Sequence, residues 1–80
     1  MKIPVIKKLV ETYEIPQLEK AEMNILEGEA LAIEVEGSDE GEQLTHGMAA
    51  IWILHEMKLR NLDFKDALRE YTKKVRESIN

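Results

Sequence analysis

Three side chains near the middle of the sequence have the types and the spacing of a chemical site. If a helix begins near Asp39, then Asp39, Glu42 and His46 stand at positions i, i+3 and i+7 and share one of its faces. Two carboxylates and an imidazole on one face can bind a hard or borderline divalent cation. The spacing therefore predicts a candidate metal site made of Asp39, Glu42 and His46.

The same residues also fit the start of an ordinary helix. Acidic side chains gather in first turns because they accept hydrogen bonds from free backbone N–H groups and balance the positive end of the helix dipole. Asp39 followed by Glu42 has the spacing of a capping box, with aspartate in place of serine or threonine. We favour this structural interpretation over the metal site.

An acid–base pair is the third interpretation of this segment. Glu42 and His46 lie about one helical turn apart, and a carboxylate beside an imidazole can transfer protons in a cleft between subunits. No nucleophile motif or phosphate-binding loop accompanies the pair in the sequence. The sequence therefore favours a protein that is not an enzyme and that binds no cofactor.

Four predicted helices position these residues, over roughly residues 3–13, 16–27, 39–60 and 63–79. Pro4 and Pro16 suit first turns, and Gly28 suits the residue that ends a helix. The third helix is apolar on nearly all sides, so we expect it to be central. One of its sides carries Leu44, Met48, Ile51, Trp52, His55 and Leu59. Its narrow polar strip comprises Glu42, His46, Glu56 and Arg60.

The two histidines have different expected roles, because their separation of nine residues places them on opposite sides of the third helix. His46 belongs to the polar strip. His55 lies among Met48, Ile51 and Trp52, which predicts a core histidine satisfied by one hydrogen bond. The alternative for His55 is a titrating group at an interface between subunits.

Residues 30–36 have a different period from the helices. Leu31, Ile33 and Val35 occupy every second position, which is the repeat of a half-buried strand. Because the sequence offers no second strand, such a strand would pair with its own copy in another subunit. The alternative, which the pattern supports equally, is an extended linker that packs these side chains on the helices without ladder hydrogen bonds.

The length and composition favour self-association. A chain of 80 residues forms one domain, residues 1–80, with a thin core, and the absence of cysteine excludes disulfides. We predict a mainly α domain of four helices, with a long central helix and one short extended or β segment before it. Because the long helix has more apolar surface than three short helices readily cover, we expect a homodimer or a larger closed oligomer. The expected interface residues are Leu31, Ile33, Val35, Trp52 and His55.

The distribution of charge excludes some classes of partner. The net charge is −5, and residues 21–46 hold eight acids and no Lys or Arg, whereas residues 47–80 hold seven bases and five acids. Such an acidic middle repels phosphate backbones, so nucleic acid is not an expected partner. The longest apolar run, residues 47–54, is too short to span a membrane. We predict a cytoplasmic interaction or regulatory protein whose acidic middle segment binds another protein.

Three stretches of the chain carry a resemblance to a known family. The runs MKIPVIKKLVE, AIEVEGSDEGEQLTHGMAAIWI and DFKDALREYTKKVRESI resemble an uncharacterised family of short proteins from Bacteroidetes, a domain of unknown function. The resemblance covers nearly the whole chain and implies a bacterial cytoplasmic protein with no assigned catalytic residues. It also implies a partner related to thioredoxin or peroxiredoxin, although a chain without cysteine cannot perform thiol chemistry itself.

Overall fold

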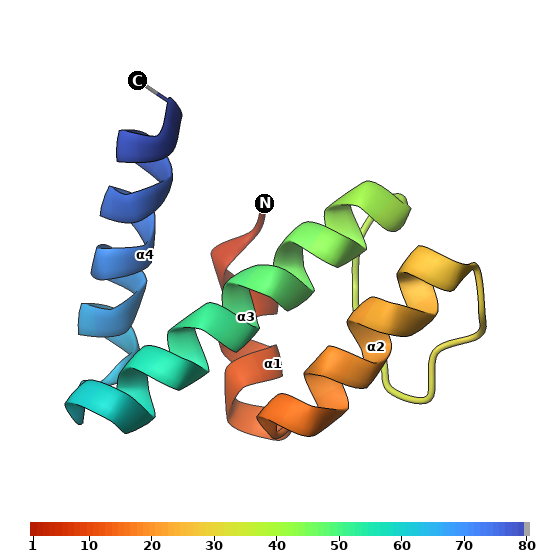
Figure 1. The fold of residues 1–80 in the computed structure, drawn as a ribbon, viewed down its shortest axis with the longest axis horizontal. Helices are drawn as coiled ribbons and strands as arrows, with labels where there is room; N and C mark the ends of the chain where they lie inside the picture. Colours follow the sequence, from red (N-terminus) through yellow and green to blue (C-terminus); the bar gives the residue numbers. More distant parts are fainter. Residues whose placement is uncertain (80) are drawn as a thin grey trace.

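The structure, a computed structural model, describes residues 1–79 and consists of four helices joined by short connections (Figure 1). The helices are α1 (Ile3–Thr12), α2 (Ile15–Glu27), α3 (Glu40–Arg60) and α4 (Phe64–Ile79). Each end lies within one residue of the predicted position, so the predicted four-helix, mainly α fold is confirmed. The agreement reflects strong local signals: Gly28 and Asn61 adopt the left-handed conformation that ends α2 and α3.

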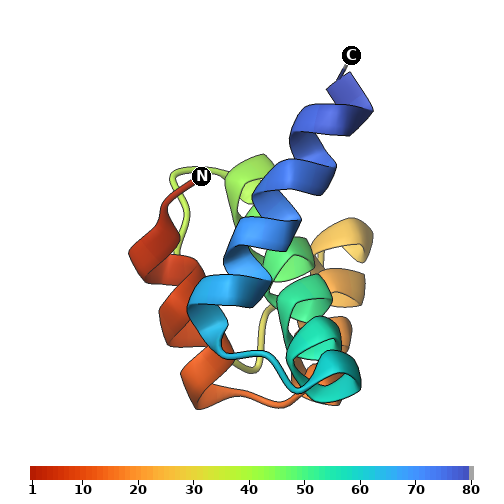
Figure 2. The ribbon, with the colours of Figure 1, turned by 90° about the vertical axis from the view of Figure 1, so that its left-hand side faces the viewer.

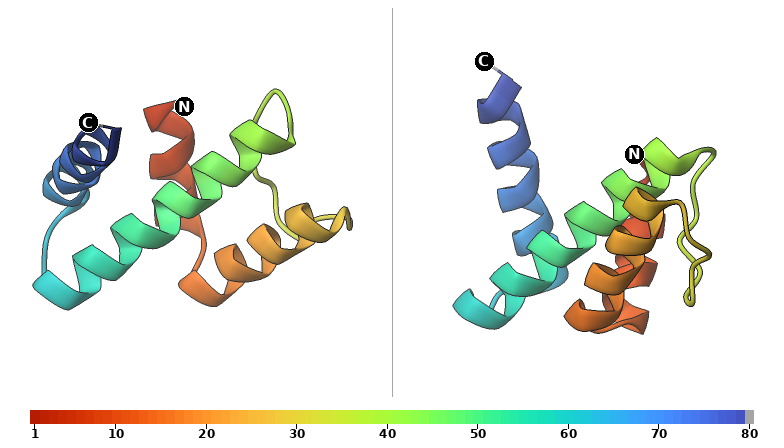
Figure 3. Two further views of the ribbon diagram at one scale, coloured as in Figure 1. Left: turned by 45° about the horizontal axis from the view of Figure 1, so that its top comes forward. Right: turned by 45° about the vertical axis from the view of Figure 1, so that its right-hand side comes forward.

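The long helix α3 is central, as predicted, because α1, α2 and α4 all pack on it. In Figures 1 and 3, α3 crosses in front of α1, and α2 runs alongside α3 in the opposite direction. α4 packs near the C-terminal end of α3, and its own C-terminal half projects beyond the other helices (Figures 1 and 2). None of the helices in residues 1–79 is both long and apolar enough to cross a lipid bilayer.

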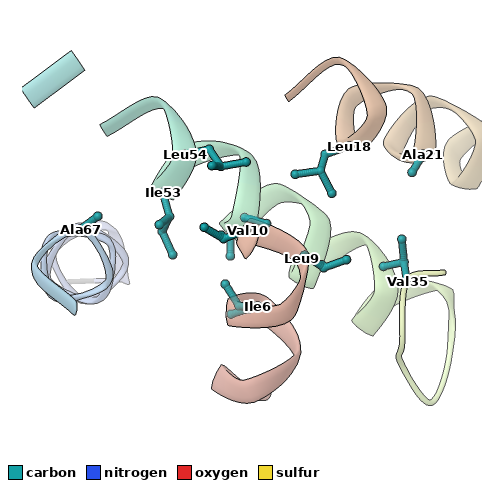
Figure 4. Packing of buried hydrophobic residues seen from close by; sticks show 11 residues of the cluster. Ile6, Leu9, Val10, Leu18, Ala21, Val35, Ile53, Leu54 and Ala67 are labelled. Carbon is teal, nitrogen blue, oxygen red and sulfur yellow. The ribbon is translucent and has the colours of Figure 1, made fainter. Parts of the chain in front are cut away.

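The buried core lies between α3 and the other helices and is built from aliphatic side chains, four of them alanines (Figure 4). α3 contributes Ala49, Ala50, Ile53 and Leu54 to this core. The remaining members are Ile6, Leu9 and Val10 of α1, Leu18 and Ala21 of α2, Val35, and Ala67 of α4. Two other large apolar side chains of α3 lie on its opposite side: Met48 is 51% exposed and Leu59 is 80% exposed. The core therefore uses the side of the central helix that carries its two alanines together with Ile53 and Leu54.

The connection between α2 and α3 contains no strand, since no strand occurs anywhere in residues 1–79. The strand alternative for residues 30–36 is therefore wrong for the chain as described, and the linker alternative fits it. Val35 is buried in the core, and Leu31 and Ile33 pack against it half-buried. The backbone of this connection forms hydrogen bonds with side chains instead of with a second strand. For example, Gln43 donates from Nε2 to the carbonyl oxygen of Val35 over 2.8 Å.

Candidate functional site

Asp39 and Glu42 cap the first turn of α3. The backbone N–H of Glu42 donates to Oδ1 of Asp39 over 2.8 Å. In return, the backbone N–H of Ser38 donates to Oε1 of Glu42 over 2.8 Å. The first bond satisfies a free donor of the helix, so the predicted N-cap role of Asp39 is confirmed. The second bond goes to Ser38, whereas a capping box would use the N–H of Asp39, so the capping box is only half formed.

His46 lies one turn further along α3 and is completely buried, with no exposed side-chain surface. Its Nε2 accepts a hydrogen bond of 2.9 Å from the backbone N–H of Lys2. Because Nε2 is the acceptor, the ring proton lies on Nδ1, which donates to the carbonyl oxygen of Glu36 over 2.8 Å. One neutral imidazole thus joins three segments: the residues before α1, the connection before α3, and α3 itself.

The predicted metal cluster is not formed. No group of three or more His, Cys, Asp or Glu side chains within the described residues is arranged to hold a metal ion. The physical reason is that Asp39, Glu42 and His46 each bond a different backbone group. Both ring nitrogens of His46 are engaged, so neither has a lone pair free for a cation.

The same hydrogen bonds give the acid–base interpretation of Glu42 and His46 no geometric support. A general base must lie within hydrogen-bond reach of a substrate proton, directly or through one water molecule. The imidazole of His46 has no solvent-exposed surface, and both of its nitrogens bond to the backbone. A substrate could reach it only after the residues before α1 or the connection moved away.

Lys8 supplies a second, weaker attachment of the acidic connection to α1. Its Nζ lies 3.5 Å from a carboxylate oxygen of Glu34 and 3.5 Å from one of Glu36. The negative charges of Glu36 and Glu34 raise the pKa of Lys8 above its ordinary value. All three side chains are exposed, so these ion pairs contribute little to the free energy of unfolding.

The structure separates the five predicted interface residues into two groups. Leu31, Ile33 and Val35 pack on the core of their own chain. Trp52 is half-buried against α4, where its ring lies 5.6 Å from the ring of Tyr71, and His55 is exposed on the outer side of α3. The interface itself stays a prediction.

The expected roles of the two histidines are reversed in the structure. His55, expected in the core, is exposed, and His46, expected on a polar strip, is completely buried. The sequence did contain a signal for His46, because it lies one turn before Ala50 and two turns before Ile53, both fully buried. If the side of α3 that carries the small residues had been predicted to face the core, His46 would have been predicted to be buried.

We expect Glu42 to make the stability of the domain depend on pH in the acidic range. The Ser38 hydrogen bond is the main cause that lowers the pKa of Glu42 below 4.5, its ordinary value. A depressed carboxyl pKa stabilises the fold above the unfolded pKa, and this stability is lost as the pH falls through the folded pKa. Urea midpoints of wild type and Glu42→Gln, measured from pH 7 to pH 3, should differ most near pH 7 and converge at the acidic end. A difference that stays constant over this range would contradict the role of the ionised carboxylate.

Comparison with known proteins supplies a family and no activity. No curated protein and no solved structure matches the chain. The model of DUF6952, a family of unknown function, matches residues 1–80, the whole sequence. The family match agrees with the resemblance to an uncharacterised family that three stretches of the sequence show. A source in Bacteroidetes stays an expectation. The chain belongs to the family of unknown function DUF6952.

Proposed function

We propose that this protein is a non-enzymatic interaction protein whose acidic surface binds a basic segment of another protein. The observation that supports the proposal is that half of the eight acids in residues 21–46 have no ion-pair or capping role within the described residues. Three of the eight form ion pairs and Asp39 caps α3. The other four have no ion-pair partner within the described part of the chain: Glu22, Glu27, Glu29 and Glu40. Their charge is available to a partner.

Apolar side chains lie among these unpaired acids. On α2, Met23 is 53% exposed and Leu26 is 66% exposed, and their spacing of three residues places them on one side of the helix. An acidic rim around exposed apolar groups suits a basic amphipathic segment, since the charges guide its approach and the apolar contacts hold it. We define Met23, Leu26, Glu27 and Glu29 as the α2 surface.

The partner class follows from this chemistry. A basic segment complements the α2 surface, whereas nucleic acid is repelled by it. Of the proteins that the family resemblance suggests, those related to thioredoxin or peroxiredoxin are the first candidates. This protein would act as their binding partner, since it holds no thiol of its own.

Charge reversal on the α2 surface tests the proposal. We expect Glu27→Lys with Glu29→Lys to weaken partner capture by about tenfold or more, because two attractive contacts become repulsive. Both residues are exposed, and a lysine at position 27 suits the negative end of α2, so the fold should persist. The measurement is quantitative pull-down from lysate, followed by titration with the captured protein.

The matched control is Glu11→Lys with Glu77→Lys, which changes the net charge by the same amount at exposed positions away from the α2 surface. Capture by this control variant should equal that of wild type. Equal loss in both variants would show that only net charge matters, and unchanged capture by the α2 variant would contradict the proposal.

A further inference from the structure

We infer that a second copy of this chain covers the outer face of α3, with the two α3 helices antiparallel. The outer face is the side of α3 turned away from its buried residues. Met48, His55 and Leu59 are exposed on it, and Leu44, Ile51 and Trp52 are half-buried at its edges. Self-association goes beyond the proposed function, which uses the α2 surface and a different partner. In the left view of Figure 3, the middle part of α3 crosses in front of α1.

The distribution of side-chain size on α3 is the first support. The core side of α3 carries two large apolar side chains, Ile53 and Leu54, among smaller ones. Its outer face carries Met48, which is 51% exposed, and Leu59, which is 80% exposed. A monomer gains most by burying its large apolar side chains, since each fully buried one contributes about 1.5–3 kcal/mol. Met48 and Leu59 stay largely uncovered in the single chain, so their apolar surface is available to a second copy.

The second support is the symmetry of the outer face itself. A two-fold axis between Ile51 and Trp52 pairs each outer-face residue with another outer-face residue of the partner. Ile51 then meets Trp52 of the partner subunit, Met48 meets His55 of the partner subunit, and Leu44 meets Leu59 of the partner subunit. All six positions are used, and each pair joins an apolar side chain to an apolar or aromatic one.

Charge complementarity selects the antiparallel direction. The first turn of α3 carries Glu40 and Glu42, and its last turn carries Lys58 and Arg60. Antiparallel pairing brings the acidic end of each helix to the basic end of the other and opposes the two helix dipoles. Parallel pairing would place acids beside acids and bases beside bases.

A stable dimer buries more area than the outer face of α3 alone can supply, so α4 must also take part in the interface. A helix of 21 residues is about 31 Å long, so a contact strip about 10 Å wide covers only roughly 300 Å², whereas stable dimers bury about 800 Å² on each partner. α4 begins just after the basic end of α3 and projects from the body of the domain (Figure 2). Its exposed basic side chains include Lys65, Arg69, Lys73 and Arg76. In the antiparallel dimer, α4 lies beside the acidic end of the partner and supplies further contact.

Light scattering coupled to gel filtration tests the dimer. We expect a wild-type mass of about 18 kDa at micromolar concentration, twice the 9.2 kDa of one chain. Met48→Glu with Leu59→Glu should return the mass to 9.2 kDa, because it puts two charges on the outer face at exposed positions. The matched control, Met23→Glu with Leu26→Glu on the α2 surface, should stay dimeric. A wild-type monomer at 100 micromolar, or a dimer broken by the control and not by the outer-face variant, would overturn the inference.

Cysteine crosslinking tests the direction, since the natural chain has no cysteine. Under oxidation, a mixture of Leu44→Cys and Leu59→Cys chains should give a mixed disulfide dimer. Leu59→Cys alone should stay uncrosslinked, and efficient crosslinking of that variant would show parallel helices and reject the antiparallel arrangement. A monomeric wild type that still binds a basic partner through the α2 surface would overturn this inference and leave the proposed function standing.

Discussion

Replacing His46 with alanine should lower the free energy of unfolding by about 3–5 kcal/mol, the largest effect that we expect from a single substitution outside the apolar core. The side chain is fully buried, so its removal leaves a cavity. The substitution also leaves the N–H of Lys2 and the carbonyl of Glu36 without their hydrogen-bond partner. A domain of this size has a total stability of about 4–12 kcal/mol, so the loss is a large share of it.

Chemical denaturation followed by circular dichroism measures this loss. The matched control is His55→Ala, which removes the same side chain from an exposed position on the same helix and should change stability by about 0.5 kcal/mol or less. Hydrogen exchange should show faster exchange at Lys2 in His46→Ala, since its N–H donates to the imidazole. Equal stability of the two alanine variants would contradict the structural role of His46.

The helices could be predicted from the sequence because their ends depend on residues near in the chain. Pro4 and Pro16 lie in first turns, and Asp39 caps α3 through its own side chain. Gly28 and Asn61 adopt positive φ angles, which few other residue types accept easily. Each of these signals acts within one turn of the helix end, so the predicted bounds differ from the observed ones by no more than one residue.

The side of α3 that faces the core could not be predicted from its hydrophobic pattern. A helix that is apolar all round has no single apolar stripe, and the packing of α1 and α2 then decides its rotation. Small residues such as Ala49 and Ala50 allow close approach of these neighbours, and that approach carries His46 inward as well. The sequence predicts which residues share a side with Met48 and Leu59, but whether that side or the opposite one is buried depends on the volumes of the side chains that α1 and α2 pack against α3.

The candidate site shows the same division between local and distant causes. The capping of α3 by Asp39 was predictable because its acceptor and donor lie three residues apart. The bond from Lys2 to His46 spans 44 residues, and the bond from Gln43 to Val35 replaces a strand ladder with a side-chain contact. Neither bond produces a periodic pattern in the sequence. The sequence alone therefore could not distinguish a strand from a linker for residues 30–36.

Gly37→Ala should lower the free energy of unfolding by about 1–3 kcal/mol, the second large effect that we expect. A Cβ atom at position 37 would lie 2.7 Å from the backbone nitrogen of Gln43 and 2.8 Å from its Cγ. Because the nearest atom belongs to the backbone of α3, the clash cannot be relieved by a rotamer change alone, and the connection must shift. That shift pulls on the hydrogen bonds from Gln43 to Val35 and from His46 to Glu36, which hold the connection on the helix.

Gly47→Ala is the matched control, since it adds the same methyl group to a glycine ten residues further along, inside α3. No heavy atom outside the helix backbone lies within 4 Å of the added Cβ, and alanine is favoured over glycine in a helix interior. We expect this variant to be about 0.5–1 kcal/mol more stable than wild type, the opposite sign from Gly37→Ala. Thermal unfolding of the two variants beside wild type decides the matter. If Gly37→Ala matched wild type, the connection would be loosely attached to α3, and the buried position of Val35 would need another cause.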